Sequence, residues 1–251
     1  MVIYKPEVIM LPTPEEVDKY AGQIIVDQVD GKHDSVLTPA TGSSPVGPYS
    51  FAIEAHKKGL DFSGVVTTNL DQYWGINRTH PLSYERVMKE ILFDYINIPE
   101  LQRHIPNSEA PDPYEEAARY ERVLKETGTS DLVILGIGPK LTCHIAFNGP
   151  GSSLYSRTRL VENDQDTIEA NARFCGGDKS QVPKYSITQG VANILEGRRI
   201  ILIAKGFGKA QGIQRSLEGS IGPDAPASFL RLHPNVTFII DQEAGSLLST
   251  L

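Results

Sequence analysis

The residues Asp131-Leu132-Val133-Ile134-Leu135-Gly136-Ile137-Gly138 form a short apolar run that ends in glycines. A run of this length, rich in Leu, Val and Ile, is typical of a strand that is buried on both faces. Both faces of a strand become buried when helices cover the two sides of a parallel sheet. This stretch therefore indicates an α/β fold.

Similar runs occur on both sides of this stretch. The expected strands cover Ser35–Leu37, Val65–Asn69, Leu132–Gly136, Ile200–Lys205 and Val236–Asp241. The expected helices between them cover Pro14–Val29, Pro45–Lys58, Ser83–Phe93, Pro113–Thr127, Thr188–Glu196 and Lys209–Leu217. Strands separated by helices need crossover connections. We therefore expect a mostly parallel sheet with helices on both faces. No repeat or linker divides the chain, so residues 1–251 are expected to form a single domain.

The composition excludes several classes of protein. Hydrophobic residues make up 40% of the 251 residues and charged residues 22%, which predicts a folded chain rather than a disordered one. A net charge of −7 argues against a nucleic-acid partner. No apolar run approaches the roughly 20 residues of a membrane helix, and the first residues lack the pattern of a signal peptide. With only two cysteines, we expect a soluble, cytoplasmic protein.

The first predicted strand is followed by Pro39-Ala40-Thr41-Gly42-Ser43-Ser44-Pro45. Ligands of parallel α/β sheets bind beyond the carboxyl ends of the strands, where this segment is expected to lie. Glycine lets a backbone approach a ligand closely, the hydroxyls donate hydrogen bonds, and the start of the next helix offers free N–H groups to an anion. The alternative is an ordinary strand-to-helix turn with a serine N-cap, and this segment alone favours neither.

Two further strand ends carry ionisable side chains. Asp71 follows the second predicted strand beside aromatic residues, and such a carboxylate can act as a general base whose pKa is tuned by partial burial. A lone aspartate is more often a turn former or helix cap. His144 follows the third predicted strand and can carry protons, although a lone histidine is more often structural.

Arg173 and Lys209 are candidate partners for a phosphate group, with exposed surface charges as the alternative. The sequence lacks a Gly-x-Gly-x-x-Gly fingerprint, which excludes a nicotinamide-dependent enzyme. Neither Cys143 nor Cys175 has a second cysteine close by, and the chain has no Glu–His spacing typical of a metal site. We therefore expect no metal and no organic cofactor.

These segments, in their order along the chain, resemble the glucosamine-6-phosphate deaminase/isomerase family, which is related to 6-phosphogluconolactonases. The likeness runs from about Leu11 to Ala244. It is carried by Ala40–Pro45, Asn69–Tyr73, His144–Asn148, Ser156–Arg159, Ala170–Phe174, Gln181–Lys184 and Pro226–Leu230. The Phe147-Asn148 continuation after the histidine favours the deaminase branch over the lactonases.

The resemblance implies a modified Rossmann-like α/β fold and the conversion of glucosamine 6-phosphate and water into fructose 6-phosphate and ammonia. It implies that Asp71 carries a proton between C2 and C1 of the open-chain sugar, and that His144 helps to open the ring. The phosphate-binding residues it implies are Thr41, Gly42, Ser43, Ser44, Arg173 and Lys209. The partner would be a small sugar phosphate, and both a monomer and a homo-oligomer fit this reading.

Two positions depart from the family pattern, in which the histidine has two acidic neighbours. Thr142 stands where the family has an aspartate, in a segment two residues longer, and Gly149 stands where it has a glutamate. A histidine without carboxylate partners loses control of its tautomer and stabilisation of its cation. Glu162 and Asp164 are candidates to replace them. Two alternatives therefore remain: a catalytically weak paralogue that binds a sugar phosphate, and a lactonase or other sugar-phosphate isomerase on the same scaffold.

Overall fold

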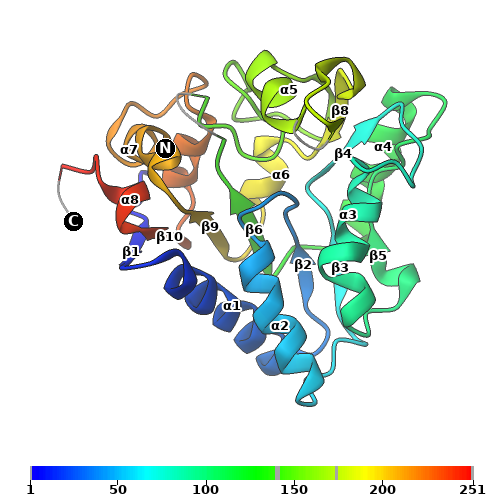
Figure 1. Cartoon of the computed structure of the whole chain (residues 1–251), viewed down its shortest axis with the longest axis horizontal. Helices are drawn as coiled ribbons and strands as arrows, with labels where there is room; N and C mark the ends of the chain where they lie inside the picture. The colour runs from blue at the N-terminus through cyan, green and yellow to red at the C-terminus, as the bar shows by residue number, and fades with distance from the viewer. Residues whose placement is uncertain (1, 139–141, 173–174, 250–251) are drawn as a thin grey trace.

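The computed structural model describes residues 2–138, 142–172 and 175–249. In this part of the chain, seven parallel strands form the main sheet in the order β1-β10-β9-β6-β2-β3-β5 (Figure 1). Their bounds are Glu7–Leu11 for β1, Val36–Thr38 for β2, Val66–Thr68 for β3, Arg103–His104 for β5, Leu132–Gly136 for β6, Ile200–Ala204 for β9 and Val236–Asp241 for β10. Strands β6 and β10 have the predicted bounds, whereas the sequence did not predict β1 and β5.

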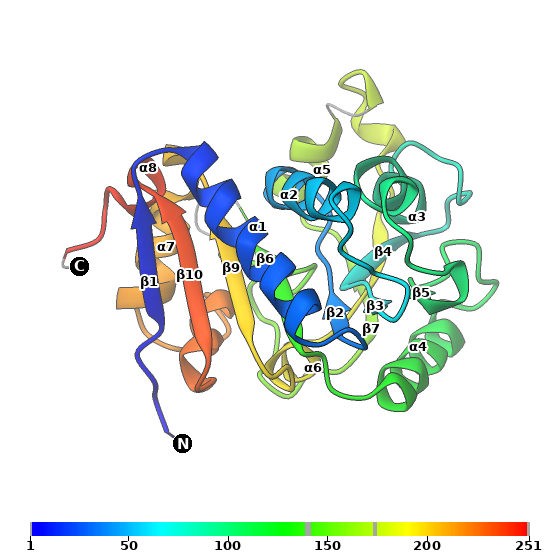
Figure 2. The same ribbon diagram turned by 90° about the horizontal axis from the view of Figure 1, so that it is seen from below.

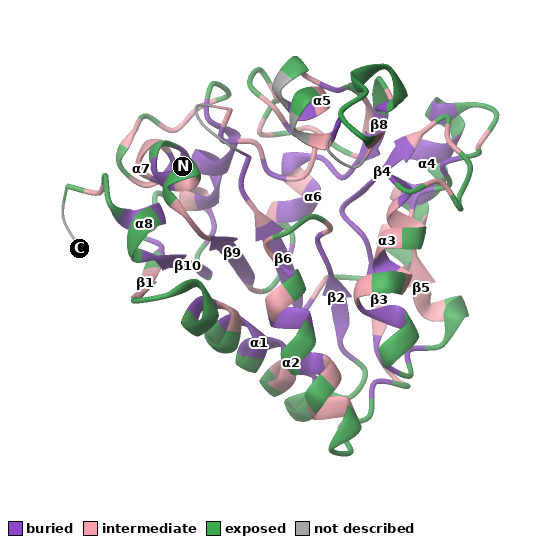
Figure 3. Cartoon of the chain, in the orientation of Figure 1, coloured by how far each residue is buried: buried purple, intermediate pink, exposed green. Residues whose placement is uncertain are grey.

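The central strands are buried on both faces, as the apolar runs predicted (Figure 3). Strand β9 illustrates this, because Ile201 and Ile203 belong to the core on one face of the sheet. Their neighbours Ile200 and Leu202 belong to a second core on the other face. Successive side chains of a strand point to opposite faces, so a continuous apolar run supplies both cores.

Helices cover both faces of the sheet, which confirms the predicted fold class. The core on one face includes residues of α1, α2 and α3, and Figure 2 shows α1 lying across β10, β9 and β6. Residues of α6, α7 and α8 and of the 3-10 helix η6 contribute to the core on the other face. The bounds are Pro14–Gly31 for α1, Val46–Lys57 for α2, Tyr84–Ile91 for α3, Pro113–Thr127 for α4, Val191–Leu195 for α6, Ala210–Glu218 for α7, Pro226–Leu232 for η6 and Gln242–Gly245 for α8.

A second, smaller sheet stands beside the main one and was not predicted. It is antiparallel and has the order β4-β8-β7, formed by Asp71–Trp74, Tyr185–Thr188 and Arg159–Glu162. The predicted helix from Thr188 is therefore wrong at its start, because Thr188 ends β8 and α6 begins only at Val191. The small sheet and helix α5 (Gln165–Ala172) lie beyond the carboxyl ends of β2, β6 and β3 (Figure 1).

Candidate functional site

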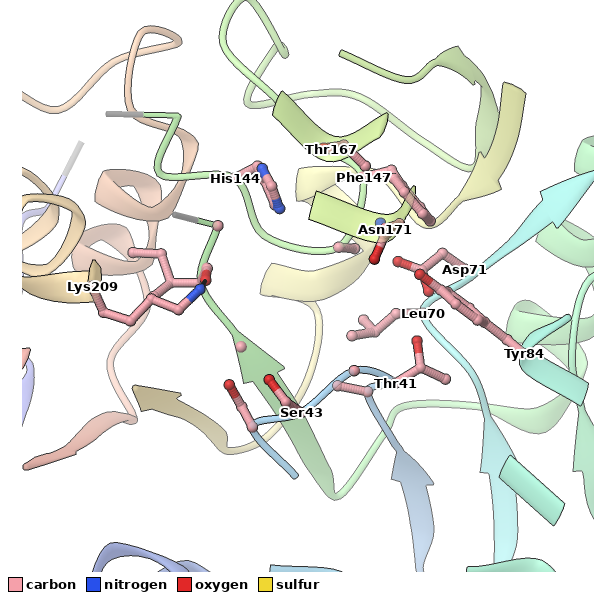
Figure 4. A pocket seen from close by; sticks show the side chains of 17 residues that line it. Thr41, Ser43, Leu70, Asp71, Tyr84, His144, Phe147, Thr167, Asn171 and Lys209 are labelled. Atoms are coloured by element: carbon pink, nitrogen blue, oxygen red, sulfur yellow. Dashed lines mark hydrogen bonds between the residues drawn. The ribbon is translucent and has the colours of Figure 1, made fainter. Parts of the chain in front are cut away.

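A cavity of about 330 Å³ lies at the carboxyl ends of the main strands, where the strand pattern placed the site. Its walls come from the segments that follow β2, β3 and β6, from α5, and from the 3-10 helix η5 (Phe207–Lys209). Figure 4 shows His144 and Lys209 on one side of this cavity and Asp71 and Tyr84 on the other. The structure thus brings together residues from distant parts of the sequence.

The segment after β2 forms one wall of the cavity. Thr41, Gly42, Ser43 and Ser44 all line it. Gly42 has φ of +94°, a backbone conformation that favours glycine. Pro45, expected as the first helical residue, is instead the N-cap of α2, and no side chain caps this helix end. The predicted alternative of a serine cap is therefore wrong, and the N–H groups in the first turn of α2 suit an anion.

Lys209 reaches the same cavity from η5. Its Nζ donates a hydrogen bond of 2.6 Å to the carbonyl oxygen of Ile137, which directs the ammonium group toward the cavity. The loop before η5 is fixed because the N–H of Gly206 donates to the Asp241 carboxylate at 2.8 Å. The second predicted cation, Arg173, lies outside the described residues, so its role stays a prediction.

Asp71 is the first residue of β4, and the residue is only 6% exposed. The prediction placed it at the end of a strand. The main-sheet strand instead ends at Thr68, and Asp71 begins the small sheet, paired in register with Thr188. Burial raises the pKa of Asp71 to about 8. A carboxyl group with a pKa in this range, open to a cavity, is suited to accept and return a proton.

Aromatic side chains to which the sequence analysis gave no role in the site enclose this carboxyl group. Tyr73, Tyr84 and Phe147 contact one another edge to face or stacked, with ring centroids 5.2–6.0 Å apart. The Tyr73 hydroxyl accepts a hydrogen bond of 2.8 Å from Nδ2 of Asn171, which also lines the cavity. Asn171 and Phe147 lie in the segments quoted for the resemblance, and that is the signal that could have found them.

His144 lies on a tightly turned segment. Its neighbours Cys143 and Ala146 have φ of 46° and 51°, values that are uncommon for residues with a side chain and often occur at functional sites. The N–H of Gly138 donates to the His144 carbonyl oxygen at 2.9 Å. The hydroxyl of Thr142 lies 3.2 Å from Nδ1 of His144. Thr142 therefore contacts the imidazole from the position where the family pattern has an aspartate.

The second altered position, Gly149, lies close to an acidic side chain. A Cβ atom built on Gly149 would lie 3.7 Å from Oδ2 of Asp164. Asp164 and Gly149 both line a second cavity of about 500 Å³, which His144 also lines. Asp164, from another segment, thus places an acidic side chain beside residue 149, where this chain has no carboxylate of its own.

Within the described ranges, no group of three or more His, Cys, Asp or Glu side chains is placed to hold a metal ion. The same residues include no helix long and apolar enough to cross a membrane.

The sequence was compared with known proteins. Residues 15–239 match the family model for glucosamine-6-phosphate isomerases and 6-phosphogluconolactonase. The chain belongs to this family. Among its curated relatives, glucosamine-6-phosphate deaminase 2 of Bacillus subtilis is 43% identical over 94% of this chain and 95% of its own. The glucosamine-6-phosphate deaminase of Halothermothrix orenii is 44% identical over 93% and 96%.

Solved structures of the family agree with this result. A monomeric glucosamine-6-phosphate deaminase superposes with a TM-score of 0.93 at 40% identity, covering 96% of this chain and 99% of its own. A 6-phosphogluconolactonase from Trypanosoma cruzi superposes with a TM-score of 0.79 at 20% identity, covering 99% of both chains. The second likeness shows the shared fold, whereas the first confirms the predicted family and its Rossmann-like architecture.

Proposed function

We propose that this chain is a glucosamine-6-phosphate deaminase, which converts glucosamine 6-phosphate and water into fructose 6-phosphate and ammonia. The observation that carries the proposal is a single cavity with the glycine- and hydroxyl-containing segment after β2 at one wall and the buried carboxyl group of Asp71 at another. Relatives of that name are 40–44% identical over almost the whole chain, which supports the same substrate.

The phosphate group of the substrate would bind between the segment after β2 and Lys209. Thr41, Ser43 and Ser44 offer hydroxyl groups, Gly42 and the start of α2 offer backbone N–H groups, and Lys209 offers a positive charge. Arg173 would complete this grip. A phosphate held at one wall leaves the other end of the sugar to reach Asp71.

Asp71 would act on the open-chain sugar. Its carboxylate takes the proton from C2 while the C1 aldehyde oxygen takes a proton from the C2 ammonium group, which gives an enolamine. The enolamine then receives the Asp71 proton at C1, and a protonated C2 imine forms. Water then attacks the imine, which releases ammonia and leaves the C2 ketone of fructose 6-phosphate. Burial favours the protonated form of Asp71 in the empty cavity, and a positively charged C2 ammonium group nearby would favour the carboxylate. The substrate would thus help to ionise its own base.

His144 would open the pyranose ring before this step. Opening breaks the bond between C1 and the ring oxygen, moves a proton from the anomeric hydroxyl and adds one to the ring oxygen. An imidazole can give one proton and take the other, so that no net charge is left. The hydroxyl of Thr142, 3.2 Å from Nδ1 of His144, supports the orientation of the imidazole for this exchange.

We also propose a cellular compartment and an oligomeric state for the enzyme. The free cysteines Cys143 and Cys175 support a reducing compartment, the cytoplasm, where sugar phosphates would be available. The described side chains that line the cavity come from one chain, which supports activity as a monomer, and a homo-oligomer stays a prediction.

A coupled assay for ammonia and fructose 6-phosphate, with glucosamine 6-phosphate as substrate, tests this function. Release of both products in equal amounts is expected. A second candidate function, a paralogue that binds sugar phosphates with little turnover, is favoured by the carboxylates missing at Thr142 and Gly149. Binding of glucosamine 6-phosphate by calorimetry without release of either product would support that candidate and overturn the enzyme proposal.

A further inference from the structure

The space beside Gly149 is occupied by a carboxylate that the reaction described above does not use. Gly149 carries no side chain, and Oδ2 of Asp164 lies 3.7 Å from the point where its Cβ atom would be. A glutamate at residue 149 would extend from that point into the same region. Asp164 therefore places its charge where a side chain from residue 149 would otherwise lie.

The backbone and the first turn of α5 hold Asp164 in this orientation. It directly precedes the helix, and its Oδ1 accepts a hydrogen bond of 2.6 Å from the N–H of Thr167. Its carbonyl oxygen accepts another, of 3.0 Å, from the N–H of Ile168. Because Oδ1 caps the helix, the carboxylate cannot rotate freely, and the second oxygen stays turned toward Gly149.

This carboxylate faces the cavity of about 500 Å³ that His144 also lines. His144, Phe147 and Thr167 line both this cavity and the proposed substrate cavity, so the two adjoin at the imidazole. The charged described residues that line them are Asp71 on β4, Lys209 on η5, Arg159 and Glu162 on β7, and Asp164 before α5.

The other charged side chains that line the two cavities differ from Asp164 in position or in the sign of their charge. Asp71 begins β4 at the opposite side of the substrate cavity (Figure 4). Glu162 is exposed at the end of β7. Arg159 is a cation that donates to Asn148 at 2.8 Å and to Ser152 at 3.1 Å. Asp164 is the acid that lies over Gly149 within the cavity that His144 lines.

We propose that Asp164 is a positioning residue for His144, supplying the negative charge that the segment around residue 149 lacks. It would act across the cavity, directly or through a bridging water, by stabilising the imidazolium form that gives a proton to the ring oxygen. The Thr142 hydroxyl contacts the imidazole but carries no charge. Thr142 would therefore help to orient the imidazole, and Asp164 would stabilise its positive charge. This inference rests on the proposed deaminase function.

The variant that isolates the charge is Asp164→Asn. Asparagine caps helices about as well as aspartate, so α5 should keep its first turn and the protein its melting temperature. We expect kcat on glucosamine 6-phosphate to fall by about 10- to 100-fold with KM unchanged, since acid–base assistance is worth roughly 10²–10⁴-fold and Thr142 still contacts the ring. The matched control is Glu162→Gln, which removes a charge from the same cavity and should leave kcat unchanged.

A second substitution tests whether Asp164 positions His144 or only stabilises the fold. Adding Gly149→Glu to Asp164→Asn places a carboxylate beside the same space, and we expect it to restore most of the lost kcat. Gly149→Glu alone brings two carboxylates together and should not raise the rate. A loss of kcat in Asp164→Asn that Gly149→Glu does not repair would overturn the proposal.

An NMR titration of the His144 imidazole gives a readout that does not depend on turnover. A nearby anion favours the imidazolium, so the pKa of His144 should be lower in Asp164→Asn than in the wild type and unchanged in Glu162→Gln. Identical titration curves in the wild type and Asp164→Asn would refute the role of Asp164, whatever the enzyme does. A wild type that shows this shift but releases no ammonia would instead refute the deaminase function and keep the electrostatic contact.

Discussion

Gly138 lies against the imidazole of His144 with no room for a side chain between them. A Cβ atom on Gly138 would lie 2.3 Å from Nδ1 of His144, far inside van der Waals contact. The backbone N–H of Gly138 also donates to the carbonyl oxygen of His144 at 2.9 Å. The segment that follows β6 and the histidine segment are therefore joined by contact at both the backbone and the ring.

This packing predicts the effect of Gly138→Ala. The added methyl group must displace the imidazole, so we expect kcat to fall at least 10-fold while the free energy of unfolding drops by about 1–3 kcal/mol. The control is Gly31→Ala at the end of α1, where no atom outside the neighbouring residues and the backbone of the helix itself lies within 4 Å of the new Cβ. Steady-state kinetics and urea unfolding measure both effects. A Gly138→Ala enzyme with wild-type kcat would show that the position of the ring does not matter.

Because the carboxyl group of Asp71 is buried, we expect the free energy of unfolding to depend on pH. Its pKa is about 8 in the folded protein against an ordinary 3.8, so between these values the folded state keeps a proton that the unfolded chain loses. The stability of the wild type therefore falls as pH rises through this window. Asp71→Asn should be as stable as the wild type near pH 4 and more stable by a few kcal/mol near pH 8. Urea unfolding at several pH values would reveal a constant difference if this account is wrong.

The same group predicts how activity depends on pH. A base must be ionised to take a proton, so kcat/KM should rise with pH and level off above about pH 8. Asp71→Asn should lose exchange of the C2 hydrogen in deuterated water while still binding the sugar phosphate. Exchange that persists in this variant would mean that the base is another residue.

Lys209 is expected to contribute binding energy rather than chemistry. A hydrogen bond to a charged group is worth about 1.5–3 kcal/mol, so Lys209→Ala should weaken binding of the sugar phosphate by roughly 10- to 150-fold. The control is Lys57→Ala, which removes an exposed lysine paired with Glu54 on α2. Calorimetry that gives equal affinities for both variants would remove Lys209 from the site.

Thr142→Val tests whether its hydroxyl orients the histidine. Valine keeps the shape of threonine but makes no hydrogen bond, and an uncharged hydrogen bond is worth about 0.5–1.5 kcal/mol. We expect kcat to fall by about 2- to 10-fold with little change in KM. Thr142→Ser keeps the hydroxyl and should retain the wild-type rate. If both variants behave alike, the contact of 3.2 Å has no role in turnover.

The sequence predicted those parts of the fold that have strong local signals. Helix α4 has its predicted bounds because Asp112 caps it, accepting from the N–H of Tyr114 at 2.7 Å, and Pro113 begins it. Strands β6 and β10 were predicted to the residue because short, continuous apolar runs need burial on both faces. The small sheet has no such signal. Its strand β4, Asp71–Trp74, is partly polar, and its partners lie far away in sequence.

The sequence predicted individual residues of the candidate site but not how they are arranged in space. Asp71 and His144 were expected at strand ends and Lys209 at the start of a helix, and the structure brings them to one cavity. Their neighbours could not be predicted in this way. Asn171 reaches the cavity because the Tyr73 hydroxyl holds its amide, and Asp164 approaches Gly149 because α5 begins there. Both contacts depend on the small sheet and α5, which no local pattern indicated.

The division of the molecule into two sheets fixes the spacing between the segment after β2 and Asp71. The proposed phosphate-binding segment follows β2 of the main sheet and Asp71 begins β4 of the small one, and Asn69 and Leu70 join β3 of the main sheet to β4. This link is fixed at both ends, because Asn69 N–H donates to His104 at 2.9 Å and Gln189 N–H donates to Leu70 at 2.8 Å. A sugar one carbon shorter would bind its phosphate equally well but present its reactive carbons out of register with the base. Selection for six-carbon substrates would then arise from the joint between two sheets rather than from a wall of the cavity.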